Sequence, residues 1–297
     1  MLKHVLKCAF AIVAGLALLA ASLGHYRPQV PYKNQVAVLM YHHIHDTDTS
    51  SATISTRLFQ DQLTYLKAQG YHFITLDDLK GFLNGGAVPP GAVLVTFDDG
   101  YKSVKTNALP ILEKMNIPAV IFYITQKQEH PEKGIPPFQS NEDIRGMLQE
   151  TSLVDIGSHT HNLHNKTGPG KGEGLLVARL KNNGKTETEE EYEKRITTDL
   201  STSLERLQAL TSKKVDTLAY PYGIFDRKSI DLAKEAGIHY AFTITQRMTL
   251  SSTDPMQIPR INAGSPNITP ELLDKTIRRE TIALPGVINW LHDHLKL

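Results

Sequence analysis

The stretch that decides the fold is Val93-Leu94-Val95-Thr96-Phe97-Asp98-Asp99-Gly100-Tyr101. Its valine- and leucine-rich first half predicts a buried strand, and Gly100 allows a sharp turn just after two adjacent carboxylates. In parallel α/β folds, ligands bind at the carboxyl ends of the strands, where Asp98 and Asp99 are expected. Two carboxylates this close raise each other's pKa unless a positive group lies beside them. A metal ion bound by one aspartate, with the other left as a base, fits this pattern, and a solvated turn is the plainer alternative.

Composition narrows the class of protein. The chain has 297 residues and a formal net charge of +1, enough for one large or two small domains and no reason to expect nucleic acid as a partner. The single cysteine, Cys8, excludes an internal disulfide framework and a cysteine-rich zinc site. The 13 histidines are therefore the better source of metal ligands.

The N-terminus has the pattern of a targeting segment. Lys3 and Lys7 precede an uncharged, apolar run that extends to Gly24. We expect residues 1–24 to be a signal peptide or a membrane anchor, and the protein to be exported, either secreted or held at the cell surface. Residues 25–35, with two prolines, are expected to form a polar linker.

Strands and helices alternate along residues 36–297, which predicts one α/β domain with a parallel sheet. We expect a (β/α) barrel-like fold, distorted or incomplete. Pro110 predicts a kink or break near Leu109 inside the helix over 102–115. Residues 165–188, rich in Gly, Lys and Asn, predict an inserted loop. The expected strands are 36–40, 93–97, 119–124, 154–157, 217–220, 239–243 and 257–261, and the other expected helices are 56–69, 76–84, 141–150, 189–210, 226–236 and 270–278.

Three of the expected strand ends carry residues suited to metal chemistry: Tyr41-His42-His43, Asp98-Asp99 and the histidines within 159–164. A catalytic zinc takes three protein ligands, keeps a position for water and favours hydrolysis of an amide or ester. Asp98 would then accept the proton of the water, and a histidine would protonate the departing amine. The spacing alone does not decide which histidines bind the metal.

These residues resemble the polysaccharide deacetylases with a NodB-homology domain, also called carbohydrate esterase family 4. The segment 96–100 is similar to the first motif of that family, and Ser158-His159-Thr160 to the start of the second. The next histidine of the second motif usually follows four residues after the first. Here it is His164, five residues after His159, which resembles the poly-β-1,6-N-acetylglucosamine de-N-acetylase branch, as does Tyr41-His42-His43.

The resemblance implies a role for each matching residue. Asp98 would be the base and His42 the general acid. Ala219-Tyr220-Pro221-Tyr222-Gly223 is similar to the third motif, in which the backbone N–H of Tyr222 would help to bind the oxyanion. Tyr101, Pro221 and Tyr222 would therefore face the substrate. One divalent metal, zinc or else nickel, cobalt or iron, would be bound by Asp99, His159 and His164.

One position departs from the family pattern. Many relatives carry an arginine where this chain has Ala219, and that arginine steadies the catalytic aspartate. Arg260 is a candidate substitute, but the sequence favours a surface arginine. We expect His43 and His161 to line the site without binding metal. His292 and His294 are expected on the surface of a short C-terminal helix.

The expected activity is metal-dependent removal of acetyl groups from an exported N-acetylglucosamine polymer, bound in an open groove. Peptidoglycan or chitin is the alternative substrate. A glycan-binding surface protein without catalysis is a rival from another class, disfavoured because all the motif residues are present. An iron oxygenase shares the ligand types, but the strand–helix pattern and the missing His-x-Asp motif argue against it.

Overall fold

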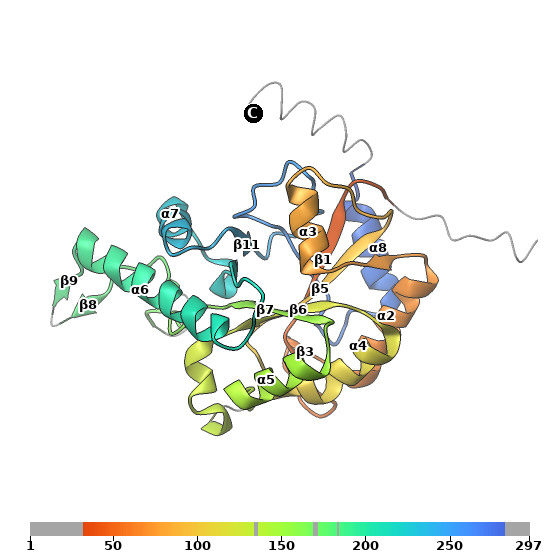
Figure 1. The fold of residues 1–297 in the computed structure, drawn as a ribbon, viewed down its shortest axis with the longest axis horizontal. Helices are drawn as coiled ribbons and strands as arrows, with labels where there is room; N and C mark the ends of the chain where they lie inside the picture. Colours follow the sequence, from red (N-terminus) through yellow and green to blue (C-terminus); the bar gives the residue numbers. More distant parts are fainter. Residues whose placement is uncertain (1–31, 134–135, 169–171, 183, 283–297) are drawn as a thin grey trace, which may run out of the picture.

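The computed structural model describes residues 32–133, 136–168, 172–182 and 184–282 (Figure 1). Its centre is an eight-stranded parallel sheet in the order β11-β10-β7-β6-β5-β1-β12, with β4 pairing with the start of β5. The strands of this sheet are β1 (Val36–Tyr41), β4 (His72–Phe73), β5 (Ala92–Phe97), β6 (Ala119–Tyr123), β7 (Val154–Ser158), β10 (Thr217–Ala219), β11 (Tyr240–Phe242) and β12 (Ile261–Asn262).

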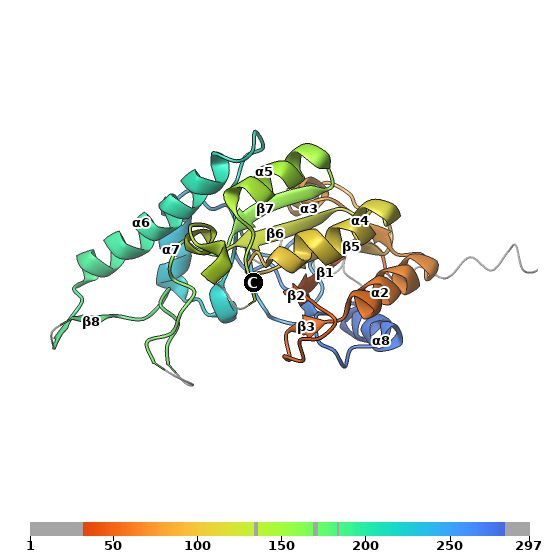
Figure 2. The same ribbon diagram turned by 90° about the horizontal axis from the view of Figure 1, so that it is seen from below.

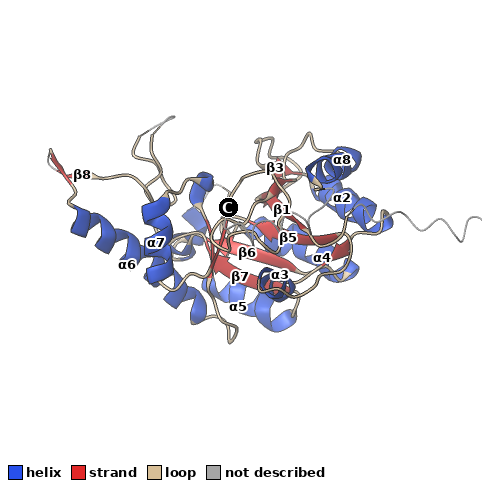
Figure 3. Ribbon diagram, turned by 90° about the horizontal axis from the view of Figure 1, so that it is seen from above, coloured by secondary structure: helices blue, strands red, loops and turns tan. Residues whose placement is uncertain are grey.

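The middle of the sheet is covered on both faces, as parallel sheets require. Every residue of β1 and of β5 is buried, and the two strands pair in register from Val36 and Ala92 to Tyr41 and Phe97. Figure 3 shows helices on the left, on the right and below these strands, with loops above them. The helices are α2 (Thr56–Ala68), α3 (Leu76–Leu83), α4 (Leu109–Met115), α5 (Asn141–Glu150), α6 (Glu189–Gln208), α7 (Arg227–Glu235) and α8 (Pro270–Glu280).

The sheet curves far enough for its two ends to meet. The extended segment that leads into β12 pairs with β11 through Phe242 and Ile258, and the N–H of Thr243 donates to the carbonyl of Ile258 at 2.8 Å. Leu39 of β1 pairs with Ile261. The expected fold class, an α/β barrel of distorted or incomplete form, is therefore confirmed. The strand predicted over 257–261 is regular only at its end, since β12 covers Ile261–Asn262 and Ile258 forms an isolated bridge to Phe242.

The predicted break near Leu109 takes the form of a wider helical turn. Residues Val104–Ala108 form a π-helical segment, η1, and α4 begins directly after it at Leu109. Pro110 lies at the start of α4, directly after the π-helical residues, and the wider turn makes room for its ring, which in a regular α-helix would clash with the carbonyl four residues earlier. Side chains of the preceding stretch contact the segment after β1: Oγ of Ser103 shares a hydrogen bond of 2.7 Å with Nδ1 of His43, and the side-chain amide of Asn107 donates to the carbonyl of Ile44 at 2.8 Å.

The segment expected to be one inserted loop contains a small hairpin, β8 (Lys181–Asn182) with β9 (Lys185–Thr186). Figure 2 shows β8 beyond one end of α6, away from the sheet. A second two-stranded ribbon, β2 (His43–Ile44) with β3 (Thr53–Ile54), follows β1. Short 3₁₀ turns complete the described elements: η2 (Thr125–Gln128), η3 (Pro131–Lys133) and η4 (Pro221–Gly223).

Both ends of the described chain meet beside the start of β1. The side-chain amide of Gln35 donates to the carbonyl of Ile282 at 2.8 Å and accepts the Ile282 N–H at 3.0 Å. Among the described residues, no helix has the length and apolar character needed to cross a membrane. The predicted targeting segment and the predicted C-terminal helix with His292 and His294 lie outside the described residues.

Candidate active site

The ends of the parallel strands bring the polar motif residues to one edge of the barrel. Tyr41 at the end of β1 pairs with Phe97 at the end of β5, and Ser158 at the end of β7 pairs with Leu218 of β10. The residues that follow these ends therefore lie within reach of one another. The segments after β1, β5 and β7 supply the acids and histidines described below, the segment after β10 supplies Tyr222, and the segment before β12 supplies Arg260.

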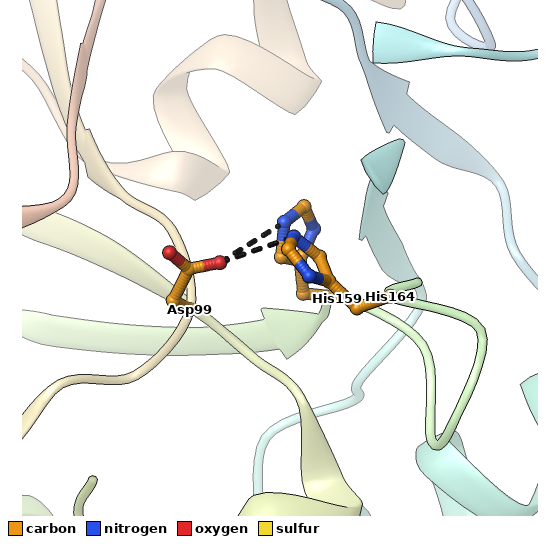
Figure 4. A group of neighbouring side chains, drawn as sticks. All are labelled: Asp99, His159 and His164. Carbon is orange, nitrogen blue, oxygen red and sulfur yellow. Dashed lines mark ion pairs between the residues drawn. The ribbon is translucent and has the colours of Figure 1, made fainter. Parts of the chain in front are cut away.

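Asp99, His159 and His164 form a compact trio (Figure 4). Oδ1 of Asp99 lies 3.5 Å from Nε2 of His159 and 3.3 Å from Nε2 of His164. One atom from each residue can be chosen so that all three lie within 4.8 Å of one another. Oδ1 of Asp99 is buried and has no hydrogen-bond partner among the described residues. A buried carboxylate oxygen without a partner is costly, and a bound cation would remove that cost.

The hydrogen bond of His159 and the pKa of His164 suit metal binding. Nδ1–H of His159 donates to the backbone carbonyl of Ala219 at 2.7 Å, so the lone pair of this imidazole is on Nε2, which faces Asp99. Burial, together with the neighbouring His159, lowers the pKa of His164 to about 4. Two imidazoles and one carboxylate are a ligand set that accepts a divalent metal with an open position.

The backbone around Asp99 explains how two adjacent aspartates face one site. Asp99 and Gly100 both have left-handed conformations, with φ of 73° and 80°, so the chain reverses directly after β5. A Cβ on Gly100 would lie 2.3 Å from Cδ1 of Tyr123. Glycine is therefore required at this position for two reasons, conformation and space.

Asp98 is held by a buried arginine. Nη1 and Nη2 of Arg260 donate to Oδ1 and Oδ2 of Asp98 at 2.7 and 2.8 Å, while Nε of Arg260 donates to the carbonyl of Thr243 at 2.8 Å. Burial would raise the pKa of the Asp98 carboxyl, but the positive charge and hydrogen bonds of Arg260 outweigh burial and lower this pKa well below its usual range. Asp98 is therefore an ionised carboxylate.

The preference for Arg260 as a surface residue was wrong, because its side chain is fully buried. The sequence did contain one indication. Because Ala219 stands where many relatives have an arginine, the carboxylate of Asp98 needs a cationic partner from another part of the chain. Proximity along the chain gave no help, since Arg260 and Asp98 are 162 residues apart. In this chain the backbone carbonyl of Ala219 accepts a hydrogen bond from Nδ1–H of His159.

His42 approaches Asp98 as well. Nε2 of His42 lies 3.8 Å from Oδ2 of Asp98, and its side chain is a quarter exposed. Asp98 therefore has a fixed, buried cation and a more accessible imidazole as neighbours. This arrangement provides one ionised acceptor and one proton carrier beside the trio.

Tyrosines form walls on two sides of the trio. The ring of Tyr222 contacts that of His164, with centroids 4.7 Å apart, and Nζ of Lys166 lies 4.7 Å from the Tyr222 ring centroid. Tyr222 has φ of 57° and is 42% exposed, whereas the preceding Pro221 is buried. Burial and the nearby Asp99 raise the pKa of Tyr101, whose ring contacts that of His43.

His43 and His161 lie outside the trio. Nδ1 of His43 shares a hydrogen bond of 2.7 Å with Oγ of Ser103, and Nδ1 of His161 shares one of 3.0 Å with Oγ1 of Thr125. Each imidazole therefore has a polar partner of its own away from Asp99.

Comparison with known proteins agrees with this geometry. Residues 85–241, just over half of the chain, match the family described as "Polysaccharide deacetylase". The chain belongs to this family. It is therefore a polysaccharide N-deacetylase by family, a hydrolase of amide bonds, and that family uses a divalent metal.

Individual relatives resemble this deacetylase over most of its length. A poly-beta-1,6-N-acetyl-D-glucosamine N-deacetylase of Staphylococcus aureus is 28% identical over 242 residues, which cover 82% of this chain and 78% of the relative. The solved de-N-acetylase of Aggregatibacter actinomycetemcomitans is 28% identical with a TM-score of 0.72, covering 82% and 100% of the two chains. The BpsB deacetylase domain of Bordetella bronchiseptica is 26% identical with a TM-score of 0.68, covering 77% and 96%.

A hollow of about 620 Å³ lies next to the catalytic edge of the deacetylase. The ring of His43, one of its lining residues, lies 5.1 Å from the ring of Tyr101, so the hollow lies beside Tyr101. The volume of the hollow is within the range of small-molecule binding sites. The hollow is lined by His43, His45, Asp48, Lys102, Ser103, Thr106, Asn107, Pro136 and Pro137.

Proposed function

We propose that this deacetylase hydrolyses N-acetyl groups of a β-1,6-linked N-acetylglucosamine polymer outside the cytoplasm. The support for the linkage is the name of the Staphylococcus aureus relative, together with the five-residue spacing from His159 to His164. The support for the reaction is one observation: the trio of Asp99, His159 and His164 lies beside an ionised, arginine-bound Asp98. The support for export is the apolar segment over 1–24.

Asp99, His159 and His164 would hold one divalent ion, with zinc the best match to two imidazoles and a carboxylate. When bound, such an ion polarises the amide carbonyl and lowers the pKa of water in the site. Three observations support this ion site: Nδ1 of His159 is engaged by the carbonyl of Ala219 so that Nε2 faces Asp99, the pKa of His164 is lowered to about 4, and Oδ1 of Asp99 has no hydrogen-bond partner among the described residues.

The proton transfers are assigned to Asp98 and His42. Asp98, kept ionised by Arg260, accepts a proton from the water that attacks the acetyl carbon. The C–N bond breaks, acetate leaves, and His42 donates a proton to the departing sugar amine. Arg260 keeps Asp98 in place throughout, since its guanidinium is bound at three nitrogens.

The remaining assigned residues would position the sugar. The backbone N–H of Tyr222 is proposed to bind the oxyanion, with Pro221 fixing the turn in front of it. The exposed ring of Tyr222 and the ring of Tyr101 are proposed to contact the sugar that reacts. The polymer is long, so further sugars would extend past Tyr101 into the hollow next to His43.

The test is amine release from matched β-1,6 and β-1,4 N-acetylglucosamine oligomers, with and without a chelator and with zinc added back. Chelator-sensitive release from the β-1,6 oligomer alone is the expected result. Release mainly from the β-1,4 oligomer would contradict the substrate and favour chitin or a wall glycan. Release that Asp98→Asn leaves unchanged would contradict the mechanism.

A further inference from the structure

The turn that joins His159 to His164 depends on side chains for its shape. Each of the four intervening N–H groups donates to a side-chain oxygen. Those of Thr160 and Leu163 donate within the turn, to Oγ of Ser158 at 3.0 Å and to Oγ1 of Thr160 at 3.2 Å. The other two N–H groups, those of His161 and Asn162, need a partner from elsewhere in the fold.

That partner is Asp199, which lies in α6. Oδ1 of Asp199 accepts the N–H of His161 and Oδ2 accepts the N–H of Asn162, both at 2.8 Å. One carboxylate therefore binds two consecutive amides at the middle of the turn. Hydrogen bonds to an ionised acceptor are shorter and stronger than those between neutral groups.

The same face of α6 holds the turn at a second point. Ser203 is four residues after Asp199, so both side chains lie on one side of the helix. Oγ of Ser203 shares a hydrogen bond of 2.7 Å with Oγ of Ser158, directly before His159. The helix thus contacts the start of the turn through Ser203 and its middle through Asp199.

The turn needs such support because its backbone is strained. Thr160 has φ of 73°, a left-handed conformation that a β-branched residue seldom adopts unless the surroundings enforce it. On the opposite side, the N–H groups of Thr125 and Gln126 donate to the carbonyls of Thr160 and His161, both at 3.1 Å. The turn is clamped between η2 and α6.

From this geometry we infer that Asp199 is a positioning residue for metal binding: it fixes the turn that places His164 beside His159. Asp199 itself does not touch the trio, and it acts through two backbone amides. The inference rests on the metal site proposed above. Asp199 belongs to none of the three motifs described above, and it follows His164 by 35 positions along the chain.

The experiment measures zinc affinity of the full chain by competition with a chromophoric chelator, in wild type, Asp199→Ala and Asp199→Asn. Outer partners of metal ligands typically contribute about tenfold to hundredfold in affinity, and we expect a loss in that range for Asp199→Ala. Asp199→Asn keeps one acceptor and turns an NH₂ toward the other amide, so we expect a smaller loss. Glu205→Gln, on an exposed part of the same helix, is the matched control and should bind zinc as wild type does.

Hydrogen exchange supplies a readout that does not depend on zinc. The amides of His161 and Asn162 should both exchange faster in Asp199→Ala, at least one of them should do so in Asp199→Asn, and both should remain protected in Glu205→Gln. A variant that melts at lower temperature but binds zinc within about threefold of wild type would overturn the inference, because Asp199 would then be only structural. If Asp199→Ala does not fold, the zinc affinity of the nearly isosteric Asp199→Asn is used in its place. An affinity within about threefold of wild type would again overturn the inference.

The two proposals fail in different ways. If wild type itself does not bind zinc, the proposed metal site is wrong and the role of Asp199 falls with it. If wild type binds zinc and releases amine while Asp199→Ala matches its affinity, only the role of Asp199 is wrong.

Discussion

Replacing Arg260 by alanine should turn Asp98 from an ionised base into a protonated acid. Both oxygens of Asp98 are bound by Arg260 at 2.7 and 2.8 Å, and both residues are buried. Removing one partner of such a pair leaves an uncompensated buried charge, which costs about 3–5 kcal/mol of stability. For a domain of this size, that corresponds to a fall in melting temperature of roughly 10 °C.

The same change should alter the pH dependence of activity and of stability. In wild type the pKa of Asp98 is below that of an unfolded aspartate, so the ion pair stabilises the fold at neutral pH and is lost as the pH falls below about 4. Without Arg260, the effect of burial on Asp98 is opposed only by the more weakly acting His159 and His42, so its pKa should rise. The free energy of unfolding should then decrease as the pH rises from about 4 to neutral, because the folded state binds the proton more tightly.

The assays are kcat/KM against pH and unfolding monitored at several pH values. We expect kcat/KM at neutral pH to fall by about a hundredfold, within the range of general base catalysis, and to recover partly as the pH increases. Arg260→Lys should restore the charge but not the paired hydrogen bonds, and so rescue only in part. Arg227→Ala is the control, since Arg227 is highly exposed and pairs only with Asp231 among the described residues.

A kcat/KM of Arg260→Ala within about threefold of wild type at every pH tested, a barrier change of roughly 0.7 kcal/mol, would show that Arg260 does not keep Asp98 ionised for catalysis. An unfolding free energy within about 1 kcal/mol of wild type would refute the stability part separately, because a broken buried pair costs more than that.

Three further predictions concern other parts of the site. His42→Asn should lower kcat by about 10²–10⁴-fold with little change in melting temperature, and an unchanged kcat would remove His42 from the mechanism. A chelator should lower the melting temperature of wild type by removing the stabilisation that a bound ion gives, about 2.7 kcal/mol at a hundredfold excess over Kd, whereas Asp99→Ala should show no such shift. Thr106→Trp should fill the hollow beside Tyr101 and raise KM for long oligomers but not for dimers. Equal effects on both lengths would show that no sugar occupies the hollow.

The sequence was most informative where acidic residues or histidines come directly after a predicted strand. Asp98, Asp99 and Gly100 could be placed at the end of β5 because a buried apolar run and a turn residue are adjacent in the chain. The cluster over 159–164 could be placed after β7 for the same reason. The choice of His164 over His161 required a resemblance to known deacetylases, since extended spacing alone favoured neither.

The parts that sequence reasoning missed depend on contacts between distant segments. Arg260 reaches Asp98 only because residues 257–262 bridge β11 and β1 and turn its side chain into the barrel. Asp199 appears from the sequence to be one of many charged residues on a solvated helix. Its role is visible only when α6 is packed beside the turn after β7. No local pattern encodes either contact.

The paired hydrogen bonds between Gln35 and Ile282 have a practical consequence for handling the enzyme. They hold both ends of the described chain at the start of β1, whereas His42 follows the other end of that strand. Six residues of strand span roughly 20 Å, so Gln35 and Ile282 lie on the opposite side of the barrel from the edge that carries His42. An enzyme shortened to the described residues and coupled to a bead or sensor chip near Gln35 or Ile282 would therefore present its catalytic edge to a passing polymer.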